Sequence, residues 1–434
     1  MTSEALTGSR TTAVQAERER WPRVFAVPRA RLRGWSADQL MRHAVRRLPV
    51  RLVLPDGQVL GSGGPESPSM LVHRPRDFQQ RVGARGLLGF GESYQAGDWD
   101  SEDLPGLLTA FATRLDRLVP APLQRLRALH VQRRPRADRN SPDGARRNIA
   151  RHYDLSDDLF TLFLDPTLTY SSALFAEDRG RPVASEELLP RAQHRKIDRL
   201  LDMAEVGPGT RLLEIGSGWG ELALRAAARG AVVRTVTLSE NQRSHVEDRA
   251  ALAGLERAVT VDLCDYRDVR GEYDVILSVE MIEAVGLEQW PVYFAALARL
   301  LAPGGRIGLQ AITMPHSRML ATADTHTWIT EYVFPGGLIP SVTAIERSAA
   351  GAGLHIWDRR AFGPHYAQTL RLWRERFLAQ AGELGRLGFD ETFRRTWELY
   401  LAYSEAGFAS GYLDVYQFLI AAGPQGPPRG QSAR

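Results

Sequence analysis

Two glutamates, Glu280 and Glu283, stand three positions apart directly after the apolar run 273–279. If both lie on one helical turn, they share a face of that helix. A buried pair of carboxylates raises the pKa of one member, and such a group suits general-base catalysis. Glu280 could instead only cap the helix that follows, and the sequence leaves both interpretations open.

A glycine-rich segment, 214–220, joins the apolar run 211–215 to a helical pattern at 221–229. Its Gly216, Ser217 and Gly218 fall in the spacing G-x-G-x-G, where glycine lets the backbone turn tightly and lets a ligand approach. The dinucleotide fingerprint is G-x-G-x-x-G, so this spacing favours a nucleoside ligand without a pyrophosphate. An ordinary strand-to-helix turn is the alternative.

Polar residues follow the next two apolar runs. Ser239 and Gln242 stand where many nucleoside-binding sheets carry an acidic residue for the ribose hydroxyls. Asp265 and Tyr266 follow the third run, where a carboxylate and an aromatic face could meet an adenine ring. Each residue alone is more typical of a loop cap, but their order after successive strands favours the ligand interpretation.

The elements that must position these residues alternate between strand and helix patterns. This alternation predicts an α/β fold, with a largely parallel sheet and helices on both faces. Two further apolar runs would close the sheet as its sixth and seventh strands. The expected strands are 211–215, 232–238, 259–263, 273–279, 306–312, 356–362 and 412–420.

The chain of 434 residues is long enough for two domains. The apolar runs 50–54 and 58–60 flank a Pro-Asp-Gly turn and predict a β-hairpin, and Ser69–Val72 predicts a further strand, within a smaller α+β domain. The expected divisions are a disordered N-terminus (1–20), the α+β domain (21–131), a linker (132–148), the larger domain (149–423) and a flexible tail (424–434).

Composition excludes several classes of protein. Cys264 is the only cysteine, so there is neither a disulfide framework nor a cysteine zinc site, and a reducing cytoplasm is expected. The histidines are scattered without paired ligand spacing, so we expect no metal. The chain shows no apolar run long enough to span a bilayer and no signal peptide at Met1. Any membrane contact would then be peripheral.

Charge is distributed unevenly. Residues 1–150 contain 25 Arg and 15 Asp or Glu, whereas residues 151–434 have an excess of acidic residues. A basic front half suits anionic phospholipid headgroups, and with no nucleic-acid motif we favour lipid over nucleic acid. A merely solvated arginine-rich surface is the alternative. Lys196 is the only lysine, which we interpret as codon bias of a GC-rich genome.

Several separated segments resemble the cyclopropane-fatty-acyl-phospholipid synthase family, and the resemblance covers roughly residues 85–420. It implies a Rossmann-like class I methyltransferase domain that uses S-adenosylmethionine (SAM), and a smaller domain that engages lipid. The segments are 86–94 (GLLGFGESY), 148–160 (NIARHYDLSDDLF), 164–171 (LDPTLTYS), 278–286 (SVEMIEAVG), 332–337 (YVFPGG) and 365–370 (HYAQTL).

The resemblance also implies which residues contact SAM. To these we add Ser217, Ser239 and Asp265 from the loop and the strand ends, and Ser278 from a matching segment. The contacts implied by the family are Tyr170, Ser171, Gly216, Gly218, Thr237, Leu238, Gln242 and Tyr266.

In the family, a bound bicarbonate removes a proton from the methyl group that has been added to the acyl chain. This bicarbonate is held by a cysteine, a glutamate, a histidine, a backbone group and a tyrosine. Here Ser172 replaces the cysteine and Gln310 replaces the histidine, which weighs against bicarbonate because glutamine cannot titrate near neutral pH. Glu280 or Glu283 could then act as the base directly. The corresponding positions are Ser172, Glu283, Gln310, Ile312 and Tyr366.

Methyl addition to an alkene leaves a carbocation, so the site must exclude water, and aromatic faces such as Tyr170, Trp219, Phe334 and Tyr366 could stabilise it. Prompt deprotonation closes a cyclopropane ring. Delayed deprotonation allows a hydride shift and gives a 10-methylene chain, the precursor of a 10-methyl (tuberculostearic-type) chain. The altered base site favours the methylene product on oleoyl-type chains of membrane phospholipids, and a cyclopropane product is the alternative.

We expect a cytoplasmic homodimer that is peripheral on the inner face of the membrane, with a reductase that acts on the product. Two other classes stay open on the sequence. A methyltransferase for a soluble small molecule would carry the same glycine loop, and a non-catalytic lipid-binding protein would need no SAM.

Overall fold

The computed structural model describes residues 17–114 and 157–423, and its contacts form two compact units. The expected linker, the C-terminal tail and residues 1–16 lie outside the described residues. The first unit comprises 1–133, 325–333 and 377–410, and the second comprises 134–324, 334–376 and 411–434. We describe each unit by itself.

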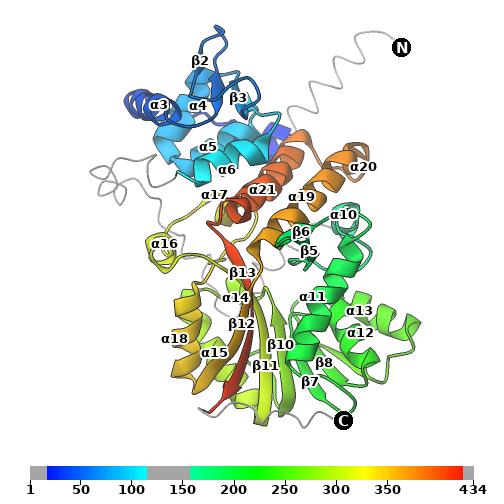
Figure 1. Cartoon of the computed structure of the whole chain (residues 1–434). Coiled ribbons are helices and arrows are strands. Elements are labelled where there is room, and N and C mark those ends of the chain that lie inside the picture. The colour runs from blue at the N-terminus through cyan, green and yellow to red at the C-terminus, as the bar shows by residue number, and fades with distance from the viewer. Residues whose placement is uncertain (1–16, 115–156, 424–434) are drawn as a thin grey trace, which may run out of the picture. The chain divides into compact units, whose positions relative to one another are not determined.

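The second unit is built on a seven-stranded mixed sheet with the order β12-β13-β11-β10-β7-β8-β9 (Figure 1). Strands β11, β10, β7, β8 and β9 run parallel, and β13 is antiparallel to both of its neighbours. The strands are β7 (Arg211–Ile215), β8 (Val232–Thr237), β9 (Val259–Leu263), β10 (Tyr273–Val279), β11 (Leu301–Thr313), β12 (Leu354–Ala361) and β13 (Asp414–Ala422).

Helices cover both faces of this sheet. Successive strand residues point to opposite faces, so each face carries apolar side chains that pack against helices. Leu212 faces a core built with α11, α12 and α13, whereas Leu213 faces a second core built with α15 and α18. The helices of this unit are α10 (Asp157–Phe163), α11 (Leu189–Met203), α12 (Glu221–Ala228), α13 (Glu240–Leu252), α14 (Ile282–Val285), α15 (Trp290–Leu300), α16 (His316–Thr322), α18 (Val342–Gly351) and α19 (Gly363–Ala379).

These elements confirm the expected α/β class, with the seven strands at the predicted places. The boundaries of β7, β9 and β10 match the predicted ones, while β11 begins five residues earlier than predicted, at Leu301. A short hairpin of β5 (Ala176–Asp178) and β6 (Arg181–Val183) and the 3-10 turn Leu287–Gln289 complete the unit.

The first unit contains a four-stranded sheet with the order β2-β1-β3-β4, and its β1–β2 pair is the predicted hairpin. The strands are β1 (Arg51–Val53), β2 (Val59–Leu60), β3 (Ser69–Val72) and β4 (Trp99–Asp100). The helices are α2 (Pro22–Phe25), α3 (Arg31–Val45), α4 (Pro75–Arg85), α5 (Leu87–Gln95), α6 (Leu104–Ala112), α17 (Trp328–Tyr332), α20 (Ala381–Arg386) and α21 (Glu391–Ala409).

Buried hydrogen bonds tie the later segments of the chain into the first unit. Trp328 Nε1 donates to Gln95 Oε1 (2.9 Å), and Arg395 donates to the carbonyl oxygens of Tyr94 (2.6 Å) and Trp99 (2.9 Å). The contacts therefore group the chain differently from the contiguous domains 21–131 and 149–423. A lipid-engaging role for the front part stays a prediction.

In the described part of the chain, no helix is both long enough and apolar enough to cross a membrane.

Candidate active site

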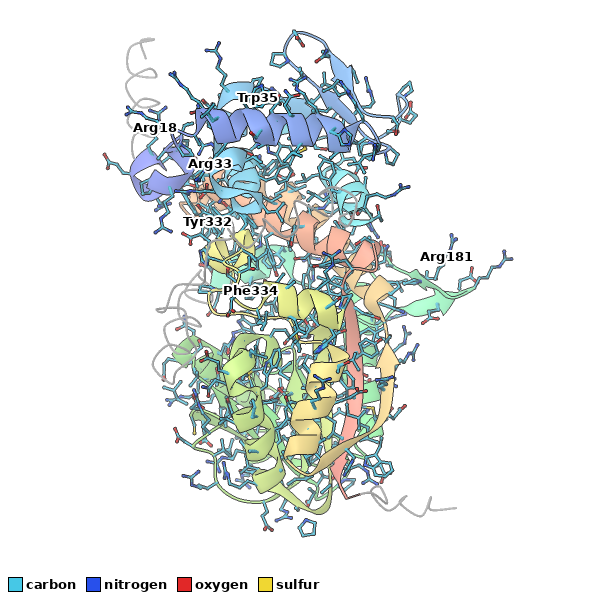
Figure 2. The ribbon with its side chains drawn as sticks, turned by 90° about the vertical axis from the view of Figure 1, so that its left-hand side faces the viewer. Arg18, Arg33, Trp35, Arg181, Tyr332 and Phe334 are labelled. Atoms are coloured by element: carbon cyan, nitrogen blue, oxygen red, sulfur yellow. The ribbon has the colours of Figure 1, made fainter. Side chains whose placement is uncertain are left out.

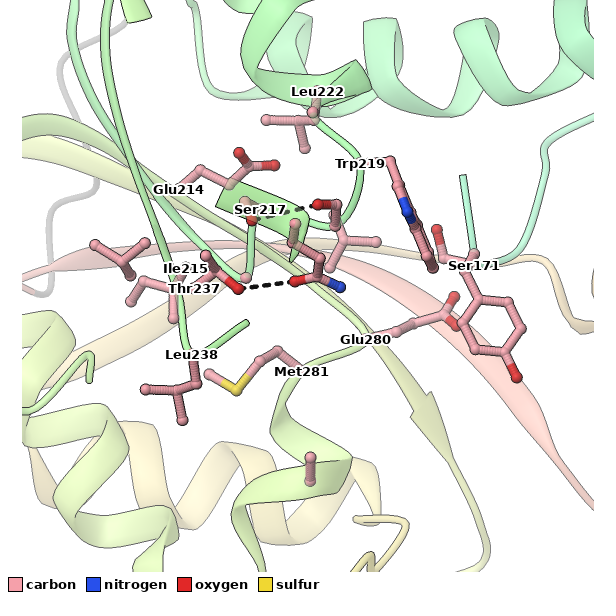
Figure 3. A pocket seen from close by; sticks show the side chains of 18 of the residues that line it. Ser171, Glu214, Ile215, Ser217, Trp219, Leu222, Thr237, Leu238, Glu280 and Met281 are labelled. Carbon is pink, nitrogen blue, oxygen red and sulfur yellow. Dashed lines mark hydrogen bonds between the residues drawn. The ribbon is translucent and has the colours of Figure 1, made fainter. Parts of the chain in front are cut away.

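A cavity lies at the carboxyl ends of β7, β8 and β10, where ligands bind in open parallel sheets (Figure 3). Glu214 and the glycine loop line it from β7, Thr237 and Leu238 from β8, and Glu280 from β10. Most of the predicted cofactor residues lie here together. They are Tyr170, Ser171, Gly216, Ser217, Gly218, Thr237, Leu238, Gln242, Asp265 and Tyr266.

The glycine loop needs backbone conformations that other residues rarely adopt. Gly216 has φ +95° and Gly218 has φ +49°, both in the left-handed region. A side chain at Gly218 would meet no protein atom within 4 Å, so the backbone there is open to an approaching ligand. The loop opens α12, whose N-terminus favours negative charge.

Two predicted cofactor residues, Ser239 and Ser278, are absent from the lining of the cavity. Ser239 is the N-cap of α13, because its Oγ accepts a hydrogen bond from the Gln242 backbone N–H (3.3 Å). Ser278 is fully buried in β10, and its Oγ donates to the Ile215 carbonyl (3.2 Å). Both therefore hold the elements that carry the site.

The end of β8 fixes the orientation of one predicted ligand. Thr237 Oγ1 donates to Gln242 Oε1 (2.7 Å), so the amide nitrogen of Gln242 is the group that can donate to a ribose hydroxyl. Asp265 is bound by Arg267 through two hydrogen bonds of 2.7 and 2.6 Å. Burial raises the pKa of the neighbouring Tyr266 to about 12, which keeps its hydroxyl protonated.

Glu280 directly follows β10 and enters the cavity from a strained backbone. Its φ is +51°, which costs a non-glycine residue on the order of 1–2 kcal/mol. The side chain does not cap α14, which begins at Ile282 without a side-chain cap. The expectation that one helical turn carries both glutamates is therefore wrong, and the capping interpretation is wrong as well.

Three of the predicted catalytic residues bind the Glu280 carboxylate. Its Oε1 accepts from the Ser172 backbone N–H (3.0 Å) and from Gln310 Nε2 (2.8 Å), and its Oε2 accepts from the Tyr366 hydroxyl (2.6 Å). Burial raises the pKa of Glu280, while the Lys196 ammonium, Tyr366, Ser172 and Gln310 oppose that rise. These groups therefore stabilise the ionised form of Glu280 against the effect of burial, which is the larger of the two.

The remaining two predicted catalytic residues bind each other. Glu283 Oε1 accepts from the Ile312 backbone N–H (2.5 Å). The pKa of Glu283 is raised to about 8, mainly by burial and secondly by the charge of Glu280. Glu283 is therefore mainly protonated at neutral pH, so the two carboxylates have different charge states.

A bicarbonate ion does not fit these residues. Of the five groups expected to hold it, Ser172, Gln310 and Tyr366 bind the Glu280 carboxylate, and Ile312 binds Glu283. A second anion would have to displace a buried carboxylate that already uses these donors. We therefore derive no step through bicarbonate.

Lys196 is a residue of the site that the sequence motifs do not predict. This residue lies on α11, is 1% exposed and lines the cavity. Its Nζ donates to Ser171 Oγ (2.5 Å), and burial lowers its pKa to about 8. The sequence did contain a signal for it. Lys196 is the only lysine in an arginine-rich chain, so its presence runs against the codon bias.

Aromatic rings surround Tyr170, one of the predicted cation-stabilising residues. Its ring centroid lies 5.2 Å from that of Phe160 and 5.4 Å from that of Trp373, and Tyr366 contacts Trp373 at 6.2 Å. Trp219 lines the cavity and packs on Phe160, while Phe334 is not part of the lining. Tyr170 and Trp219 are the members of this cluster that line the cavity, and they give it an aromatic, electron-rich wall.

Comparisons with known proteins agree with this geometry. The family model described as mycolic acid cyclopropane synthetase matches residues 140–418. The tuberculostearic acid methyltransferase UfaA1 of Mycobacterium tuberculosis is 54% identical over 97% of this chain and 99% of its own. The cyclopropane-fatty-acyl-phospholipid synthase of Escherichia coli is 32% identical over 80% of this chain and 86% of its own.

A solved structure shows the cofactor product in this fold. The mycolic acid cyclopropane synthase CmaA1, complexed with SAH and CTAB, superposes with a TM-score of 0.57 and 33% identity, covering 66% of this chain and 98% of CmaA1. The fold and the cavity at its strand ends define a class I SAM-dependent methyltransferase. The chain belongs to the mycolic acid cyclopropane synthetase family.

Proposed function

We propose that this enzyme methylates the cis double bond of oleoyl-type acyl chains in membrane phospholipids and gives a 10-methylene chain, the precursor of a 10-methyl chain. The observation that carries the proposal is the buried Glu280 carboxylate, held by three donors at the cavity. The 54% identity to a tuberculostearic acid methyltransferase supports the branched product.

The residues of the cavity fit SAM, which when bound supplies an electrophilic methyl group. The Gly216–Gly218 backbone leaves room for the methionyl part, and Gln242 offers donors to the ribose. Tyr266 provides an aromatic face beside the adenine position. These assignments extend the resemblance residue by residue and are part of the proposal.

The π electrons of the acyl double bond would form a carbon–carbon bond to the methyl group that SAM supplies, with the electrons of the methyl–sulfur bond leaving on S-adenosylhomocysteine, and the neighbouring acyl carbon would become a cation. A hydride shift from the methylated carbon then moves the charge onto that carbon. Glu280 accepts a proton from the added methyl group, and the electrons of that C–H bond form the exocyclic double bond. The aromatic wall around Tyr170 excludes water and stabilises the cation.

The choice of product follows from the basicity of Glu280. Burial raises the pKa of Glu280, but its three donors and Lys196 oppose that rise, so Glu280 is a weaker base than the same buried carboxylate would be without these partners. Weaker basicity delays proton removal, which gives the hydride shift time to occur. Glu283 is mainly neutral at pH 7 and leaves Glu280 as the base.

The test is to incubate the enzyme with SAM and dioleoyl-phospholipid vesicles and to analyse the extracted acyl chains by mass spectrometry before and after ozonolysis. A methylene chain adds 14 mass units and is cleaved by ozone at the branch. A ring of the same mass resists ozone, and that result would overturn the methylene assignment. Activity on a water-soluble acceptor alone would overturn the lipid assignment.

The first unit presents a surface that suits a bilayer. On α3, Leu32 is 84% exposed and Trp35 is 65% exposed, and the neighbouring Arg31 and Arg33 are exposed as well (Figure 2). Apolar side chains flanked by arginine are typical of helices that lie in a membrane interface. This face supports the proposal that the enzyme is peripheral on a membrane, and the cytoplasmic location on the inner face is proposed from the sequence.

Two partners complete the proposal, one suggested by the family resemblance and the other by the chemistry of the product. A homodimer is the expected assembly. A reductase that saturates the methylene group is the expected consumer of the product, because an exocyclic methylene becomes a methyl branch by addition of two hydrogens.

A further inference from the structure

Among the cationic side chains of helix α11, Lys196 and Arg199 stand three positions apart. Residues with this spacing are neighbours on the helix surface. Lys196 is buried in the cavity, and the Arg199 side chain is 23% exposed. Arg199 is connected to the carboxylate of Glu280 by a chain of hydrogen bonds, and Lys196 by two hydrogen bonds with one peptide unit between them.

The first chain starts at Arg199 and passes through two buried glutamines. Arg199 Nη1 donates to Gln417 Oε1 (2.6 Å). Gln417 Nε2 donates to the Lys196 carbonyl and to Gln310 Oε1, both at 3.0 Å. Gln310 Nε2 then donates to Glu280 (2.8 Å).

The chemistry of its fixed ends orients both amides in this chain. A guanidinium can only donate, so Gln417 must turn its oxygen to Arg199. A backbone carbonyl can only accept, so the Gln417 nitrogen faces Lys196 and Gln310. Gln310 is then forced to accept from Gln417 and to present its NH₂ group to Glu280.

The connection from Lys196 is shorter and passes through the peptide unit between Ser171 and Ser172. Lys196 Nζ donates to Ser171 Oγ, and the next residue, Ser172, donates its backbone N–H to Glu280 Oε1. The positive charge of Lys196 also acts on Glu280 through space, where it opposes the effect of burial on the pKa. The ammonium is shared with other carboxylates, those of Asp165, Glu214 and Glu221.

We infer that Lys196 and Arg199 are positioning residues that hold Glu280 ionised and aimed into the cavity, one through Ser171 and Ser172 and the other through Gln417 and Gln310. This inference rests on the proposed role of Glu280 as the base. The other titratable groups that face Glu280 are Tyr366 on α19, which donates to it, and Glu283 on α14, which is kept mainly neutral.

The sharpest test is Gln417→Glu, which replaces one amide by a carboxylate of the same shape. A carboxylate accepts from Gln310 instead of donating to it, so Gln310 turns its oxygen toward Glu280 and destabilises the ionised form. We expect the acid limb of the kcat–pH profile to move up by at least about one pH unit. The SAM dissociation constant, measured by calorimetry, should stay within about twofold, because Gln417 is not part of the cavity lining.

A second pair of variants keeps the test independent of how Gln417→Glu folds. Arg199→Met removes the charge and the donor at the partly exposed end of the chain, and Arg199→Lys restores both. The acid limb should move up in Arg199→Met and return in Arg199→Lys. Arg191→Gln, at an exposed position of the same helix, should keep the wild-type profile.

The outcomes separate this inference from the proposed function. Glu280→Gln is the reference variant. If Glu280→Gln keeps the wild-type rate, Glu280 is not the base and the proposed mechanism fails. If Glu280→Gln is inactive while Gln417→Glu and Arg199→Met lose rate equally at every pH, Glu280 is the base and the positioning inference is overturned.

Discussion

Glu283 lies close enough to Glu280 that the charge of Glu280 contributes to raising the pKa of Glu283 to about 8. The two carboxylates follow the same strand, but only Glu280 has three donors around it. The donors around Glu280 and the charge of Lys196 oppose the rise of its pKa on burial, whereas the pKa of Glu283 reaches about 8 and leaves that side chain mainly neutral at pH 7.

This difference predicts a pH dependence of stability. Glu283 ionises near pH 4.5 when the chain is unfolded and near pH 8 when it is folded, so the unfolded state binds fewer protons in between. Stability should therefore fall as pH rises from about 4.5 to about 8, and Glu283→Gln should reduce this fall. Thermal melts at half-unit pH steps measure it, and equal slopes in both proteins would contradict the assignment.

Glu280→Gly should inactivate the enzyme and permit chemical rescue. The variant removes the base and the strain of φ +51°, and it leaves Ser172, Gln310 and Tyr366 around an empty space. Activity should fall by at least about 10²-fold, the usual range for a lost general base. Added formate or bicarbonate should restore part of it in the variant but not in Glu280→Gln, where the side chain still fills the space.

The glycine loop allows a matched pair of substitutions. Gly218 and Gly209 both have positive φ (+49° and +78°), and a Cβ at either position meets no protein atom within 4 Å. Replacing either glycine by alanine should lower the free energy of unfolding by about 1–2 kcal/mol. Only Gly218→Ala should weaken SAM binding, by about tenfold or more, because only Gly218 lines the cavity. Calorimetric titration with SAM measures the difference.

The exposed face of α3 should bind anionic vesicles. Replacing Leu32 and Trp35 by serine should weaken sedimentation with phosphatidylglycerol vesicles by at least about tenfold, because partial burial of two large apolar side chains contributes roughly 2–3 kcal/mol. Leu252→Ser, at a residue that is 89% exposed on the second unit, should leave binding unchanged. A change in the sedimentation coefficient without vesicles would instead indicate that the face contacts a second copy of the chain.

Local patterns were sufficient to predict the sheet of the second unit. Buried parallel strands such as Tyr273–Val279 are short apolar runs bounded by turns, which sequence periodicity detects. Motif order was likewise enough to bring Tyr170, Gly216 and Tyr266 to one cavity. Single polar residues at strand ends were harder to assign, since Ser239 caps α13 instead of lining the cavity.

Long-range relationships could not be predicted in this way. The grouping of 377–410 with the N-terminal residues depends on contacts between segments about 300 positions apart, such as Arg395 with Tyr94. The link from Arg199 through Gln417 to Gln310 has the same origin, because each residue comes from a different element. The backbone conformation of Glu280, with φ +51°, could not be predicted from helical spacing either, since such strain is visible only in the folded backbone.

The proton acceptor that we propose for this site is a side chain, and a side chain cannot dissociate when the gas phase changes. An enzyme that borrows a dissolved ion for this step works at a rate set partly by how much carbon dioxide the surroundings supply. With Glu280 in that place, lipid modification should proceed equally well in degassed buffer and in air, and a cell's respiration should not govern how branched its membrane becomes.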